Sequence, residues 1–115
     1  METNKETFSR FGKSFQEKLC HLMLQDRPFC DQITEVLDIN FLQYEHLRVF
    51  TQILIDYREK YRTHPSYDIM ATKIKSGLDS YTPGLQKQIR MFYASVLSES
   101  ELRDAEFIKD NALDF

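Results

Sequence analysis

The stretch from Asn40 to Arg62, NFLQYEHLRVFTQILIDYREKYR, constrains the fold of this chain more than any other. Large apolar residues recur in it every three or four positions, which is the period of an α-helix with one buried face. These residues are Leu47, Phe50, Leu54, Tyr57 and Tyr61, and Val49 and Ile53 widen the face. A helix with so wide an apolar surface must be covered by other elements. We therefore expect a small helical bundle around one long central helix.

The rest of the chain is also typical of helices. It has 115 residues with only three glycines and three prolines, and no segment alternates apolar and polar residues as a half-buried strand does. A chain of this length forms one domain of ordinary size. The predicted fold class is therefore all-α.

Capping residues and prolines divide the chain into six expected helices. They are residues 14–25, 28–37, 40–62, 66–77, 83–97 and a last helix from about residue 98. The second helix is expected to bury Phe29, Ile33, Val36 and Leu37. Ser14 with Glu17, and Ser98 with Glu101, have the spacing of a capping box. Asn40 is the expected cap of the long helix.

The expected helices group into three regions. Residues 1–13 are polar and without periodicity, so we expect a flexible tail, with Phe8 and Phe11 as its possible anchors. Residues 14–77 form the bundle core. Residues 82–115 hold two helices with a very short break between them, which predicts an antiparallel helical hairpin.

The expected last helix reaches Phe115 without the glycine, asparagine or basic last turn of a helix end. We therefore interpret the chain as truncated within a longer protein. The alternative is a natural terminus that frays.

Composition bears on the function classes. The formal net charge of −3 and the pI near 5.6 argue against tight nucleic-acid binding, which normally requires a basic surface. The polar N-terminus has no apolar segment of signal-peptide length, and no stretch is long and apolar enough to span a membrane. We expect a cytoplasmic protein without a membrane partner. Cys20 and Cys30 lie among apolar helical residues and are expected to be buried free thiols.

No pattern in the sequence predicts catalysis. Gly12-Lys13-Ser14 resembles the end of a phosphate-binding loop, but Thr7 stands where that motif needs another glycine. The possible metal ligands are dispersed without the spacing of a four-ligand site: His21, His46, His64, Cys20 and Cys30. We predict no catalytic, cofactor or metal residues in this chain. A small cysteine or metal enzyme is the alternative, and it requires a reactive thiol or a bound metal.

Two apolar residues lie outside the expected buried faces. Met91 is opposite the apolar stripe of the fifth helix, and Phe107 points away from the main face of the sixth. Single exposed apolar residues are common. A two-helix hairpin, however, has little apolar surface to pack against unless it meets the bundle or another copy. The predicted self-association interface consists of Met91, Tyr93 and Phe107.

Four motifs follow one another in a recognisable order. They are LMLQD at 22–26 followed by Phe29, LDINF at 37–41, HLRVF at 46–50 and PSYDI at 65–69. In their order and spacing, residues 15–115 resemble the N-terminal domain of DnaB-family replicative DNA helicases, particularly the phage versions. The connection near 98–100 is shorter than in the usual bacterial pattern.

The resemblance implies a non-catalytic domain for assembly and partner docking. In that family a helical bundle precedes a hairpin, and hairpins of neighbouring subunits pair to form a hexameric collar that docks primase or a helicase loader. ATP and magnesium belong to a separate C-terminal ATPase domain, which would follow Phe115. The alternative is a small standalone helical regulator that binds a helix of a partner protein.

Overall fold

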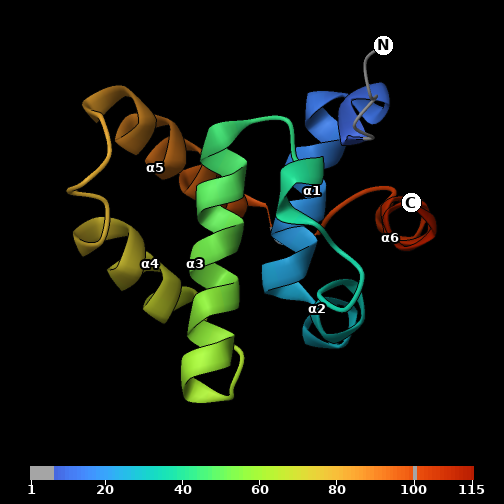
Figure 1. The fold of residues 1–115 in the computed structure, drawn as a ribbon, viewed down its shortest axis with the longest axis horizontal. Coiled ribbons are helices and arrows are strands. Elements are labelled where there is room, and N and C mark those ends of the chain that lie inside the picture. Colours follow the sequence, from blue (N-terminus) through green and yellow to red (C-terminus); the bar gives the residue numbers. More distant parts are fainter. Residues whose placement is uncertain (1–6, 100) are drawn as a thin grey trace, which may run out of the picture.

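The computed structural model describes residues 7–99 and 101–115, and within them every regular element is a helix (Figure 1). The elements are η1 Phe8–Phe11, α1 Gly12–Gln25, α2 Arg27–Ile33, η2 Ile39–Phe41, α3 Glu45–Tyr61, α4 Tyr67–Ser76, α5 Pro83–Ser98 and α6 Ala105–Asp114. The predicted all-α class is confirmed. In the described part of the chain, no helix is long and apolar enough to cross a membrane.

The long helix α3 lies at the centre of the bundle, as its periodicity predicts. It packs against α1 on one side and against α4 and α5 on the other, while α1 in turn packs against α2, α6 and η1 (Figure 1). Leu47, Phe50 and Leu54 have no exposed surface. Tyr61 is half exposed because the last turn of α3 extends past its neighbours.

The N-terminal segment is folded further toward its start than expected. Phe8 is fully buried in the 3-10 helix η1, which runs directly into α1. Ser14 therefore lies inside a helix that begins at Gly12, and it does not act as the predicted cap. Of the expected tail over residues 1–13, residues 8–13 belong to the fold, and residues 1–6 lie outside the described residues.

A cluster of aromatic rings explains this folded start. The Phe8 ring lies 4.6–6.2 Å, centroid to centroid, from the rings of Phe11, Phe15, Phe41 and Phe115. These rings come from η1, α1, η2 and the residue after α6. The cluster therefore joins the two ends of the described chain to its middle.

Several helix boundaries differ from the predicted ones. The second helix ends at Ile33, so Val36 is exposed and Leu37 is only partly buried. Asn40 does not cap the long helix; it lies in η2, where its backbone N–H donates to the Asp38 carboxylate at 2.9 Å. The predicted long helix began too early because the sequence prediction included this separate 3-10 turn in the same helix.

Two predicted caps are confirmed. The Ser66 hydroxyl accepts a hydrogen bond from the backbone N–H of Ile69 at 3.1 Å, and the Thr82 hydroxyl accepts one from Leu85 at 3.3 Å. Each cap satisfies one of the free N–H groups at a helix start. The starts of α4 and α5 are thus set by local sequence.

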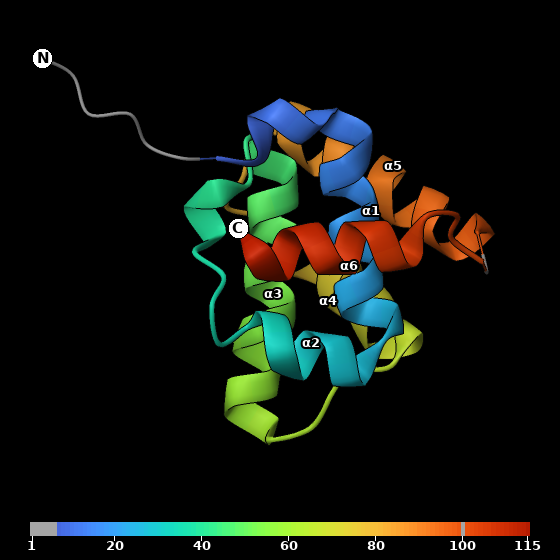
Figure 2. The same cartoon turned by 90° about the vertical axis from the view of Figure 1, so that its right-hand side faces the viewer.

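The last two helices do not pair as the predicted hairpin over residues 82–115. Within the described residues, α5 packs against α3 and α4, whereas α6 lies across α1 and α2 (Figure 2). Ile108 and Ala112 bury the inner face of α6, and Lys109 Nζ lies 2.6 Å from Asp26 Oδ2. The bundle itself thus supplies the surface that covers α6.

The break between these helices is also longer than predicted. Ser98 is the last residue of α5, and its hydroxyl donates to the Ser95 carbonyl at 2.9 Å. Helix α6 starts only at Ala105, after Asp104 in a left-handed conformation with φ of 62°. The expected capping box of Ser98 and Glu101 is therefore not formed.

Candidate docking surface

The three residues predicted for self-association occupy different environments. Met91 and Phe107 are 62% and 59% exposed, as large apolar residues of an interface would be in a free chain. Tyr93 is only 5% exposed. Its hydroxyl donates to the carbonyl of Tyr67 at 2.5 Å, and burial raises its pKa to about 12. Tyr93 is thus a core residue that ties α5 to α4, in contrast to the predicted surface position.

Met91 and Phe107 belong to separate surfaces. Met91 lines a hollow of about 420 Å³ whose other walls include Lys13 and Glu17 of α1 and His46 of α3. Phe107 lies on α6, which packs on α1 and α2. Because α5 and α6 pack on different helices, the two residues do not form one hairpin face.

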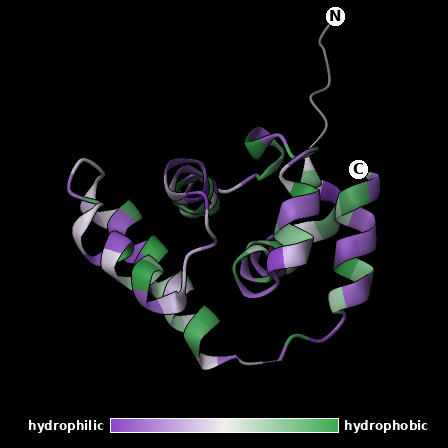
Figure 3. Ribbon diagram, turned by 90° about the horizontal axis from the view of Figure 1, so that it is seen from below, coloured by the Kyte–Doolittle hydropathy of each residue, from purple (hydrophilic) through white to green (hydrophobic). Residues whose placement is uncertain are grey.

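An apolar groove runs between α4 and α5. It has a volume of about 240 Å³ and is lined by Ala71, Ile74, Lys75, Arg90, Tyr93, Ala94 and Leu97. The small side chains of Ala71 and Ala94 leave the space open. Leu97, at the edge of this groove, is 56% exposed. It lies near the C-terminal end of α5, where the ribbon is hydrophobic in Figure 3. We call this feature the α4/α5 groove.

The α4/α5 groove is basic at one end and apolar at the other. Lys75 of α4 and Arg90 of α5 lie at the basic end, and Lys87 lies on the same side of α5 as Arg90 because it precedes Arg90 by one helical turn. At the other end, Leu97 also borders a second hollow that includes Tyr67. Sequence reasoning missed the groove because its walls come from two helices.

The outer face of α6 has the opposite character. Phe107 is its exposed apolar residue, and Asp110 follows it by three positions, so that both lie on one face. Glu106 and Asp114 are also exposed on this helix. We call the surface formed by Phe107, Glu106, Asp110 and Asp114 the α6 face.

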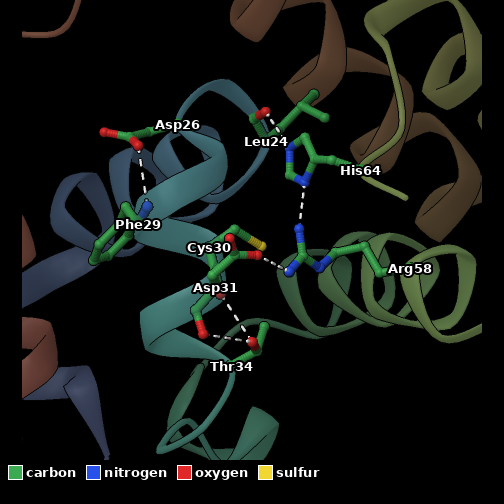
Figure 4. A network of polar contacts seen from close by, with 8 residues as sticks. All are labelled: Leu24, Asp26, Phe29, Cys30, Asp31, Thr34, Arg58 and His64. Atoms are coloured by element: carbon green, nitrogen blue, oxygen red, sulfur yellow. Dashed lines mark hydrogen bonds and ion pairs between the residues drawn. The ribbon is translucent and has the colours of Figure 1, made fainter. Parts of the chain in front are cut away.

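A polar network fixes the far end of α3 (Figure 4). The Arg58 guanidinium forms an ion pair with Asp31 of α2, and it lies 2.6 Å from Nδ1 of His64. His64 Nε2 lies 2.7 Å from the carbonyl oxygen of Leu24 and donates to it. Nδ1 is therefore the acceptor for Arg58, and the imidazole is neutral. The network links α1, α2, α3 and the loop after α3.

The three histidines are expected to make the stability of the fold depend on pH. Burial lowers the pKa of His21, His46 and His64, with a further lowering of the His64 pKa by the Arg58 charge. Below about pH 6.5 the unfolded chain therefore binds protons that the folded chain does not. The free energy of unfolding should fall as the pH is lowered through this range, as measured by urea denaturation. The variant His64→Gln should show a shallower fall, and a stability that rises on acidification would contradict the assignment.

Both cysteines are free and buried, as predicted. The Cys20 sulfur lies 3.3 Å from the Thr51 hydroxyl oxygen. Burial raises the pKa of Cys20 to about 12 and that of Cys30 to about 11. The thiolate is the nucleophilic form, so burial makes both thiols poor nucleophiles near neutral pH. Across residues 7–99 and 101–115, no three His, Cys, Asp or Glu side chains gather as a metal site would require.

Comparison with known proteins gives no relative. No family model matches the chain. No curated protein and no solved structure matches it either. The resemblance to DnaB-type N-terminal domains therefore remains a prediction from the sequence motifs.

Proposed function

We propose that this chain is a non-catalytic assembly and docking domain, in which the α6 face of one copy binds in the α4/α5 groove of another. The observation that carries this proposal is the exposure of Leu97 at the open α4/α5 groove and of Phe107 on the separate α6 face. Large exposed apolar side chains, and an open groove lined by apolar ones, mark surfaces that a partner covers. Both residues lie on helices whose other faces are buried in the bundle.

Charge supports the choice of a second copy as the partner. Lys75 and Arg90 border the groove, and Glu106 and Asp110 flank Phe107 on α6. Docking of Phe107 between the alanines of the groove would place opposite charges at the rim. Such complementarity selects the partner and its orientation more than it adds affinity.

The two surfaces differ, so the contact is heterologous. A contact of this type repeats from copy to copy and closes into a ring or continues as a filament. Two surfaces of this size bury on the order of 1,000 Å² in total, which is typical of a weak interface. The isolated chain is therefore expected to associate only at high concentration.

Within this role we propose the N-terminal domain of a DnaB-type replicative helicase, which docks a primase or a loader. The four sequence motifs and the all-helical bundle support this assignment. The packing of α6 on the bundle favours the second candidate, a standalone regulator that binds a partner protein. The open reading frame discriminates between them, since continuation into a phosphate-binding loop supports the helicase and a stop codon supports the regulator.

Single glutamate substitutions test the proposed surfaces. Leu97→Glu in the groove and Phe107→Glu on the α6 face should each abolish concentration-dependent association in sedimentation equilibrium, because each buries a charge in an apolar contact. Val36→Glu alters an equally exposed residue outside both surfaces and should associate as the wild type does.

The variant Met91→Glu distinguishes the proposed contact between the α6 face and the α4/α5 groove from the interface at Met91 that the sequence predicts. Loss of association with Met91→Glu but not with Leu97→Glu would place the interface at the hollow that Met91 lines. A wild-type chain that stays monomeric at all concentrations would contradict self-assembly.

A further inference from the structure

A polar hollow lies at the C-terminal end of the long helix α3. It has a volume of about 250 Å³ and is lined by Arg27, Asp31, Arg58, Arg62, Thr63 and His64. The residues come from the start and middle of α2, the last turns of α3 and the loop that follows. Three arginines therefore line one hollow where three segments of the chain meet.

One of these arginines is already held in place. Arg58 is bound by Asp31 on one side and by His64 Nδ1 on the other, and its side chain is only 18% exposed (Figure 4). The neutral His64 adds no charge to the hollow. Asp31 offsets one positive charge, and the guanidinium of Arg58 lowers the pKa of that carboxyl group so that it stays ionised.

The other two arginines have no ion pair of their own with a lining carboxylate, although the charge of Arg27 also helps to lower the pKa of Asp31. Asp31 is the single carboxylate among the lining residues, and its ion pair is with Arg58. The hollow thus carries three positive charges against one negative charge, a surplus of two. The charge of Arg27 also acts on His64, whose pKa it helps to lower. Like charges that line one hollow repel one another, and a bound anion would relieve the repulsion.

The backbone adds a second observation. Arg62 ends α3 in a left-handed conformation with φ of 58°, where glycine is the favoured residue. Many helices end with one residue in this conformation, and here it sets the direction in which the chain leaves α3. The left-handed turn brings Arg62 and Thr63 to the wall of the hollow that faces α2.

We propose that this hollow binds a phosphate group. Arg27 and Arg62 supply the free guanidinium groups, and the fixed Arg58 and the Thr63 hydroxyl border the same space. A phosphomonoester carries close to two negative charges at neutral pH, which matches the surplus of two. Guanidinium groups bind tetrahedral oxyanions through paired, charge-assisted hydrogen bonds. The site is independent of the proposed assembly surfaces.

Titration of the full chain with inorganic phosphate tests the proposal. Binding is followed by the NMR signals of the His64 imidazole and by calorimetry, with phosphate up to about 50 mM exchanged against sodium chloride at constant ionic strength. The wild type should show saturable shifts of His64. The variant Arg27→Gln with Arg62→Gln should bind at least about tenfold more weakly, since it loses two charge-assisted contacts.

A matched variant controls for non-specific attraction of phosphate by surface charge. Lys73→Gln with Arg103→Gln removes the same charge from two exposed residues outside the hollow and should leave phosphate binding unchanged. Absence of saturation in the wild type, equal binding by the variant Arg27→Gln with Arg62→Gln, or an equal loss in the control variant would each overturn the site. The source of the phosphate follows from titrations with phosphoserine and adenosine monophosphate. Tighter binding of one of these esters than of inorganic phosphate assigns the site to that ester. Equal affinities for all three assign the site to free phosphate.

Discussion

Replacement of Phe50 by alanine should lower the free energy of unfolding by about 3–5 kcal/mol, which is a large part of the stability of an ordinary small domain. Phe50 has no exposed surface. Its ring meets that of Phe92 edge-to-face at 5.0 Å and lies 6.2 Å from that of Tyr93. The substitution removes the contact that holds α3 on α5 and leaves a cavity that the rigid helices cannot fill.

Urea denaturation followed by circular dichroism measures this effect. Phe107→Ala is the matched control, because it deletes the same ring from an exposed position and should change the free energy of unfolding by no more than about 0.5 kcal/mol. Similar losses in the two variants would mean that Phe50 is not in the core.

Replacement of Phe8 by alanine should also cost about 3–5 kcal/mol, although the residue lies in a segment that the sequence suggests is a tail. Phe8 is fully buried and contacts Phe41 and Phe115 through its ring. These contacts hold η1, η2 and the end of α6 together. The loss should therefore be concentrated at this edge of the bundle.

Hydrogen exchange distinguishes this local effect from a global one. In Phe8→Ala the amides of α6 should exchange faster than those in the middle of α3, because α6 can then open locally while the α3 amides exchange only when the whole fold opens. Unchanged exchange in α6, with the wild-type free energy of unfolding, would show that Phe8 does not anchor this part of the chain.

The predictable part of the fold is the part with local causes. The buried face of α3 follows from the helical period, and the caps at Ser66 and Thr82 follow from side chains that bond within three residues. The burial of Phe8 depends on Phe41 and Phe115, which are distant in sequence, and no local pattern contains that information. Likewise, the position of α6 depends on which surface of α1 and α2 the other helices leave open.

The candidate surfaces were predictable only in part. Exposure of Met91 and Phe107 follows from their positions on their helices. Burial of Tyr93 was also within reach, since it lies four residues after Ile89 and three before Val96 and so shares their buried stripe. The α4/α5 groove could not be predicted, because it forms only where Ala71 of α4 and Ala94 of α5 line the same space between two packed helices.

A mixing experiment tests the assembly proposal most directly. Leu97→Glu lacks a working groove but keeps the α6 face, and Phe107→Glu lacks the α6 face but keeps the groove. Each variant alone should be a monomer in sedimentation equilibrium, whereas an equimolar mixture should form a one-to-one dimer that grows no further. A mixture that stays monomeric, while the wild type associates, would contradict the head-to-tail contact between the α6 face and the α4/α5 groove.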